Sequence, residues 1–255
     1  MPPTTWPSEL ADVQPSAYLN AIIFEFIAFI VVVILVLLSI QRYRERMGKP
    51  TFYLILFYSG IAFALLMTVI AKSLIYFWEV EFLSAHYFDK IALIGLLSSH
   101  VALLLFDSNI FTQIEFKKGV LLLSIYTSVA FLPLVIELFM RDHLTAFTSV
   151  WILGVSLIPY SLHIKWAHDL SEMVEDKMPR LGIRLILIQG ICLIAYIILV
   201  LTSSIFIVAD LLRPFNFLYY MSQIFLIGAL FSSYLGHFLP TWFQSLYSRF
   251  FLVSS

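Results

Sequence analysis

Residues Tyr18–Ile40 read YLNAIIFEFIAFIVVVILVLLSI, an apolar run that contains one charged side chain, Glu25. A stretch of this length crosses a bilayer as an α-helix, because about 20 residues at ~1.5 Å each match a hydrocarbon core ~30 Å thick. Six similar runs follow, approximately Phe52–Phe77, Ile91–Phe111, Gly119–Met140, Ser149–Ile164, Leu181–Ala209 and Phe217–Leu239. The sequence therefore predicts an all-α polytopic membrane bundle of seven transmembrane helices.

The composition of the chain agrees with a fold solvated by lipid. Hydrophobic residues make up 61% of the 255 residues and charged residues 12%, which leaves too few polar side chains to cover a soluble domain. The runs lack the strict alternation of a membrane β-barrel, so helices are expected throughout. The fifth run is short and contains Pro159, whereas the sixth is longer than a bilayer requires and is expected to tilt or project.

The distribution of Lys and Arg predicts the orientation of the chain. Eleven of the 15 basic residues fall on one side of the predicted membrane: Arg42, Arg44, Arg46, Lys49, Lys117, Lys118, Lys165, Lys177, Arg180, Arg184 and Arg249. Basic loops stay in the cytoplasm, so the N-terminus is expected outside the plasma membrane and the C-terminus inside. The predicted organisation is an extracellular tail (residues 1–17), the transmembrane domain (18–240) and a juxtamembrane amphipathic helix and tail (241–255).

The linkers between the runs are too short for a soluble domain, which needs more than about 50 residues. They contain no Gly-rich phosphate loop, no CxxC pair and no HExxH. Any chemistry is therefore expected inside the bundle or at its mouths. The expected partners are the lipid bilayer and a cytoplasmic or membrane protein, with no nucleic acid.

Ionisable side chains within the apolar runs are costly in lipid and need a reason. Glu25 and Lys72 are expected at similar depths in adjacent helices, so an ion pair between them is the simplest interpretation, with ligand binding as the alternative. Glu137 and Asp210 fall near the outer ends of their runs, followed by Arg141 and Arg213. Glu137, Asp210 and Glu25 together would suit an outward-facing vestibule for a small cationic ligand. This candidate ligand-binding set consists of Glu25, Lys72, His100, Glu137 and Asp210.

His100 lies near the middle of the third run, seven residues before Asp107, so both side chains share one helical face. That face should point into the bundle, because an imidazole facing lipid has no hydrogen-bond partner. We expect His100 to bond a Tyr or Ser of a neighbouring helix. Asp107 is expected near the cytoplasmic boundary, in an interfacial role.

Three histidines, His163, His168 and His237, are expected near the cytoplasmic ends of the fifth and seventh runs. With Asp107 they resemble the zinc-ligand collection of the ceramidase and adiponectin-receptor type of seven-helix hydrolases. Those families carry a His-x-x-x-His pair on one helix face, whereas His163 and His168 lie five residues apart, about 140° round a helix. We therefore predict no metal or other cofactor; the alternative is zinc held by Asp107, His163 and His237.

The seventh run carries small residues at Gly228, Ser232 and Gly236, a spacing that predicts close approach of another helix. It contains no lysine, so a retinal Schiff base is disfavoured. Beyond Pro240, large apolar residues recur in a four-residue rhythm that predicts an amphipathic interfacial helix over Thr241–Leu252.

This tail is similar to the juxtamembrane eighth helix of seven-transmembrane receptors. The stretch GHFLPTW (Gly236–Trp242), together with the predicted topology, also resembles the end of seven-helix input modules of prokaryotic sensor kinases. The resemblance implies a non-enzymatic sensor or receptor-like protein that transmits a signal to a cytoplasmic partner. The alternatives are a membrane-embedded metal-dependent lipid hydrolase and a small transporter or complex subunit.

Overall fold

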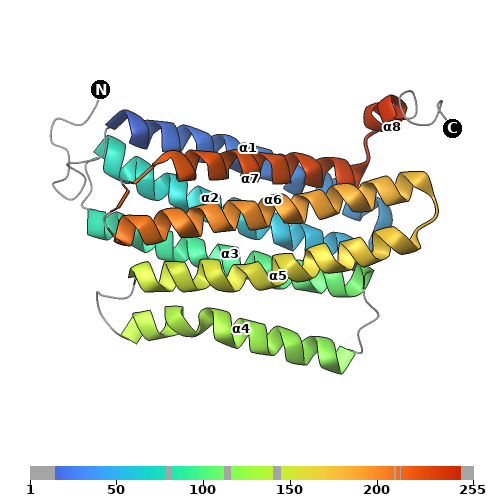
Figure 1. Cartoon of the computed structure of the whole chain (residues 1–255), viewed down its shortest axis with the longest axis horizontal. Helices are drawn as coiled ribbons and strands as arrows, with labels where there is room; N and C mark the ends of the chain where they lie inside the picture. The colour runs from blue at the N-terminus through green and yellow to red at the C-terminus, as the bar shows by residue number, and fades with distance from the viewer. Residues whose placement is uncertain are drawn as a thin grey trace.

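The computed structural model describes residues 15–78, 82–111, 116–139, 145–209, 211–212 and 214–247, and this part of the chain is helical, without a β-strand (Figure 1). The predicted all-α class is confirmed. The helices are α1 (Pro15–Arg46), α2 (Lys49–Trp78), α3 (Phe82–Ile110), α4 (Phe116–Phe139), α5 (Thr145–Met173), α6 (Lys177–Val208), α7 (Phe217–Phe238) and α8 (Thr241–Tyr247).

The ends of α7 show how local sequence sets the helix boundaries. Asn216 precedes the helix in an extended conformation, and its side-chain oxygen accepts hydrogen bonds from the backbone N–H groups of Leu218 and Tyr219, at 2.9 and 3.3 Å. These bonds satisfy donors that have no partner within the helix. At the other end Leu239 is left-handed, with φ 41°, and Pro240 follows, so the chain turns away before α8 begins.

The exposed faces of the helices are apolar, the reverse of a soluble bundle. Along α1 most of the exposed large side chains follow helical spacing: Ile23, Phe26, Ile27, Ile30, Ile34 and Leu37. Among the described residues, five helical segments are long and apolar enough to cross a membrane: Ser16–Glu45, Lys49–Trp78, Tyr87–Ile110, Lys177–Ile207 and Phe217–Phe238. The chain is thus a multi-pass membrane protein by length and composition.

The fourth and fifth predicted spans differ from these five helices. The described side chains of α4 give a shorter apolar segment, Leu121–Ile136, and α5 is not among the candidate spans. The helix of α5 continues through Pro159 and runs on to Met173, past the end of the apolar run at Ile164. The seven-span count therefore stays a prediction.

Six of the helices form a closed ring, and α4 lies outside it. Around the ring, α1 contacts α2, α2 contacts α3, α3 contacts α5, α5 contacts α6, α6 contacts α7, and α7 returns to α1. The remaining long helix, α4, packs against α3 and α5 and forms one edge of the molecule (Figure 1). The largest cluster of buried side chains, which includes Leu35, Phe57, Leu103, Tyr160 and Ile197, lies inside the ring.

The small-residue stripe of α7 packs closely against α6, as predicted. A Cβ atom on Gly236 would lie 3.0 Å from the backbone oxygen of Gly182, 3.0 Å from the backbone nitrogen of Ile186 and 2.9 Å from the Ile186 side chain. Two of these neighbours are backbone atoms, which cannot rotate aside. By contrast, a Cβ on Gly228 would meet the Cys192 sulfur at 3.6 Å, an ordinary contact.

We expect Gly236→Ala to destabilise the protein by about 1–3 kcal/mol, the usual range for overpacking a filled core. The α6 and α7 backbones must separate to admit the new methyl group. Thermal unfolding in detergent measures the effect. Gly228→Ala, in the same helix, is the matched control and should leave the melting temperature nearly unchanged; an equal loss in both variants would contradict a specific close contact at Gly236.

Candidate functional site

In the described interior, three groups of polar side chains that include a histidine or a charged residue each join different helices. The Glu25 cluster consists of Glu25, Lys72 and Tyr219; the His100 cluster of His100, Tyr126, Ser156 and Tyr160; and the Asp107 pair of Asp107 and His163. Polar groups facing a membrane interior must find partners within the protein. These three groups are therefore candidate sites for a function of the bundle.

The Glu25 cluster joins α1, α2 and α7. The Lys72 ammonium lies 2.8 and 2.7 Å from the two carboxylate oxygens of Glu25, so the predicted ion pair is present. The Tyr219 hydroxyl donates a hydrogen bond of 2.7 Å to Oε1 of the same carboxylate. The side chains of Lys72 and Glu25 are 15% and 8% exposed. One carboxylate thus holds three helices together through charge-assisted hydrogen bonds.

Tyr219 is the member of this cluster that the sequence did not reveal. It lies 194 residues from Glu25, in an aromatic segment, FLYYM, at the start of α7. Its neighbour Tyr220 donates instead to the backbone oxygen of Ala17, at 3.2 Å. Nothing in the local pattern distinguishes the two tyrosines, since the choice depends on which side of α7 faces α1.

The His100 cluster joins α3, α4 and α5. Nε2 of His100 lies 3.1 Å from the Tyr160 hydroxyl, and Nδ1 lies 3.0 Å from the Tyr126 hydroxyl. The Ser156 hydroxyl approaches Nδ1 at 3.5 Å and donates to the backbone oxygen of Ile152 at 2.6 Å. The expected bond from His100 to a neighbouring Tyr is confirmed. Both ring nitrogens have protein partners, so in this structure His100 serves helix packing.

The Asp107 pair is completely buried between α3 and α5. Nδ1 of His163 lies 2.8 Å from Oδ1 of Asp107, and both side chains are 0% exposed. Packing of α5 against α3 buries the Asp107 side chain within the protein, and its expected place at the membrane interface stays a prediction. The second carboxylate oxygen and the imidazole Nε2 have no hydrogen-bond partner among the described residues. A carboxylate that accepts a hydrogen bond from Nδ1 fixes the orientation of Nε2, as it does in metal-binding and catalytic histidines.

Neither His237, the third residue of the alternative zinc set, nor His168 joins this pair. His168 is exposed, with its ring 3.9 Å from Asp169. The ring of His237 packs edge-on against Phe106, with centroids 5.3 Å apart, and against Tyr58, at 6.4 Å. Within the described part of the chain, no group of three or more His, Cys, Asp or Glu side chains has the spacing of a metal site.

Two residues of the predicted vestibule cannot be placed. Asp210 and the side chain of Glu137 lie outside the described residues, as do Arg141 and Arg213. The outward-facing vestibule with Glu25 thus stays a prediction.

Two contacts tie α7 to its neighbours away from the Glu25 cluster. The hydroxyl groups of Tyr58 on α2 and Ser233 on α7 hydrogen-bond in the buried interior. The Arg42 guanidinium of α1 lies 5.8 Å from the centre of the Phe238 ring, at the last residue of α7. The helix that leads into α8 packs mainly against α6 and is also tied to α1 and α2 by these single contacts.

No protein-family model matches the chain, and neither the curated proteins nor the solved structures contain a match. The likeness of Gly236–Trp242 to sensor and receptor sequences therefore rests on those residues and the predicted topology. The function of the bundle therefore has to be inferred from its buried polar side chains.

Proposed function

We propose that the protein is a seven-span sensor of the plasma membrane, with its N-terminus outside and its C-terminus in the cytoplasm. The observation that carries this proposal is the Glu25 cluster. It joins α1, α2 and α7 near the end of the bundle where α7 begins, and α8 follows the opposite end of α7 (Figure 1). A polar contact that holds α7 at one end is thus connected by a single helix to the segment nearest the cytoplasm.

The signal would be a shift between two packings of α7. A small cationic ligand that binds the Glu25 carboxylate competes with Lys72 and Tyr219 for the same two oxygens. If it displaces them, α7 loses a charge-assisted bond to α1, and the ligand favours the packing in which that bond is absent. The ligand moves the equilibrium only by its difference in affinity for the two packings. A cytoplasmic or membrane protein that contacts α8 would then read the new position.

Weakening the cluster without any ligand should reproduce part of this shift. Tyr219→Phe removes a hydrogen bond to a charged group, worth about 1.5–3 kcal/mol, which is roughly a tenfold or larger change in the ratio of two packings. Spin labels on Met173→Cys and Thr241→Cys, with Cys192→Ser as background, report the distance between the end of α5 and α8 in lipid nanodiscs. We expect Tyr219→Phe to displace or broaden this distance distribution.

Tyr234→Phe, which removes a hydroxyl from the same helix away from Glu25, is the matched control and should leave the distribution unchanged. Identical distance distributions for the wild-type protein, Tyr219→Phe and Tyr234→Phe would contradict the coupling on which the sensor function depends.

Labelling of single cysteines tests the orientation of the chain in the membrane. In intact cells a membrane-impermeant maleimide should label Ser8→Cys and spare Thr241→Cys, and labelling of Thr241→Cys would reverse the topology.

The Asp107 pair favours a second candidate, a membrane-embedded hydrolase. Its His163 ring is oriented by a carboxylate and has a free Nε2 among the described contacts, as a metal ligand or general base requires. Metal content of the purified protein separates this candidate from the sensor. The transporter or complex subunit has no specific contact in its favour.

A further inference from the structure

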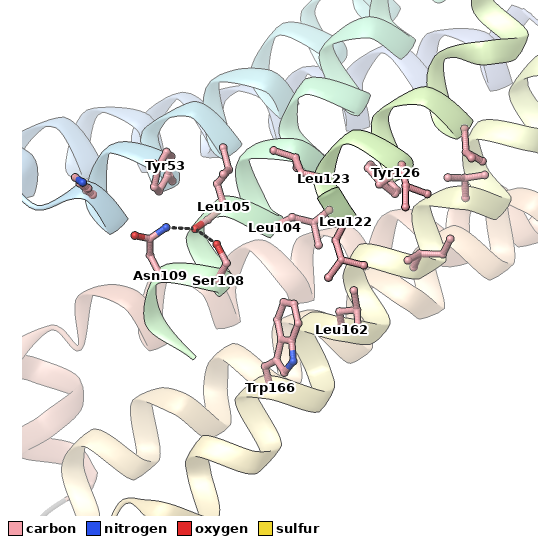
Figure 2. A pocket seen from close by; sticks show the side chains of 15 residues that line it. Tyr53, Leu104, Leu105, Ser108, Asn109, Leu122, Leu123, Tyr126, Leu162 and Trp166 are labelled. Carbon is pink, nitrogen blue, oxygen red and sulfur yellow. Dashed lines mark hydrogen bonds between the residues drawn. The ribbon is translucent and has the colours of Figure 1, made fainter. Parts of the chain in front are cut away.

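A cavity of about 420 Å³ lies between α2, α3, α4 and α5, on the side of the ring where α4 is attached. Its volume falls within the usual range of ligand pockets, roughly 300–1,000 Å³. Figure 2 shows its lining, with Tyr53 and Asn109 on one side of the view and Tyr126 on the other. It does not include the Glu25 cluster or the Asp107 pair, and most of its lining is apolar.

The cavity runs along the helices over the depth of one leaflet. On α5 its lining residues are Val155, Ile158, Leu162 and Trp166, which share one face of the helix. From Val155 to Trp166 the helix rises about 16 Å, at ~1.5 Å per residue. Half of a bilayer's hydrocarbon core is about 15 Å thick. A slot of this length, beside the candidate spans α2 and α3 that also line it, matches a hydrocarbon chain of a lipid.

The end of the cavity near the start of α2 is polar. Lys49, the first residue of α2, is the one charged side chain among the 15 lining residues, so the lining carries a single positive charge. Asn109 and Ser108 lie near the end of α3 and both donate to the backbone oxygen of Leu105, at 2.7 and 3.0 Å. Trp166 lines the same part of the slot, and tryptophan prefers the headgroup level.

We propose that this cavity binds one anionic phospholipid from the leaflet at the N-terminal end of α2. A hydrocarbon chain fills the slot between α4 and α5, and the phosphate group lies at Lys49. The charge of Lys49 selects an anionic over a zwitterionic headgroup, while the apolar length selects a lipid over a water-soluble anion. The bound lipid also fills the space between the ring and α4. This inference requires that the chain span the bilayer and is independent of the sensor function.

Native mass spectrometry of the full-length protein in detergent tests the proposal. The probes are dioleoyl phosphatidylglycerol and dioleoyl phosphatidylcholine, which share their hydrocarbon chains and differ in charge. We expect one phosphatidylglycerol per chain to bind in preference to phosphatidylcholine. Lys49→Gln should reduce the preference about fivefold, since a basic residue at the membrane surface attracts an anionic lipid by about that factor. Lys165→Gln, an exposed lysine outside the cavity, is the control and should retain the preference.

Leu162→Trp fills the slot and should reduce binding of both lipids, whereas Ile188→Trp, on the exposed face of α6, should not. Equal binding of the two lipids that neither Lys49→Gln nor Leu162→Trp changes would indicate only lipid from the surrounding annulus and would overturn the proposal. Loss with Leu162→Trp, but no effect of Lys49→Gln, would rule out headgroup selection by Lys49. A dimer that Leu162→Trp dissociates would make a second copy of the chain the occupant instead.

Discussion

Replacing Glu25 with Gln is expected to destabilise the protein by about 3–5 kcal/mol, the range seen when one partner of a buried ion pair is removed. The variant leaves the Lys72 ammonium, 15% exposed, without the carboxylate that lies 2.7 Å from it. The Tyr219 hydroxyl loses its charged acceptor at the same time. The measurement is the free energy of unfolding in mixed micelles titrated with a denaturing detergent.

Adding Lys72→Met to Glu25→Gln should recover part of this loss, because a lone buried charge costs more than an apolar side chain of similar length. The double-mutant cycle therefore gives a coupling energy well above zero. Glu175→Gln, an exposed acid between α5 and α6, is the control and should change stability by less than about 0.5 kcal/mol. Strictly additive effects of the Glu25 and Lys72 substitutions would mean that the two side chains do not interact.

Replacing His163 with Phe should destabilise the protein by a similar amount, about 3–5 kcal/mol. Phenylalanine keeps an aromatic ring between α3 and α5 but cannot donate to Asp107, whose side chain is 0% exposed and whose other oxygen already lacks a described partner. Asp107→Asn, added to this variant, removes the charge and should restore part of the stability. His168→Phe, at an exposed histidine, should have little effect; an equal loss there would contradict the importance of the buried pair.

The zinc content of the purified protein distinguishes the sensor from the hydrolase. We expect the purified wild-type protein to contain far less than one zinc ion per chain, because His168 and His237 do not join the Asp107 pair. A zinc content near one per chain that is lost in both His163→Phe and His237→Ala would instead favour the hydrolase. Loss of zinc in His163→Phe alone would place the metal at the Asp107 pair without His237.

Local pattern was enough to predict part of the polar interior. Glu25 and Lys72 are single charges in long apolar runs, at similar depths, and so few partners are available in lipid that the pairing could be predicted. The bond of His100 to tyrosine was predictable for the same reason. Asp107 and His163 were expected together only in the alternative zinc set. That they form a buried pair without His168 or His237 depends on which sides of α3 and α5 meet, which hydropathy does not report.

The apolar runs alone show that this is an all-helical, multi-pass membrane protein, because insertion of a helix depends on the apolar character of consecutive residues. Two features follow from packing instead: six helices close into a ring with α4 outside it, and Tyr219 rather than Tyr220 binds Glu25. Lipid solvates every apolar face equally well, so hydropathy does not show which faces meet. That choice depends on close packing, as between Gly182 and Gly236, and on polar contacts between residues far apart in the chain.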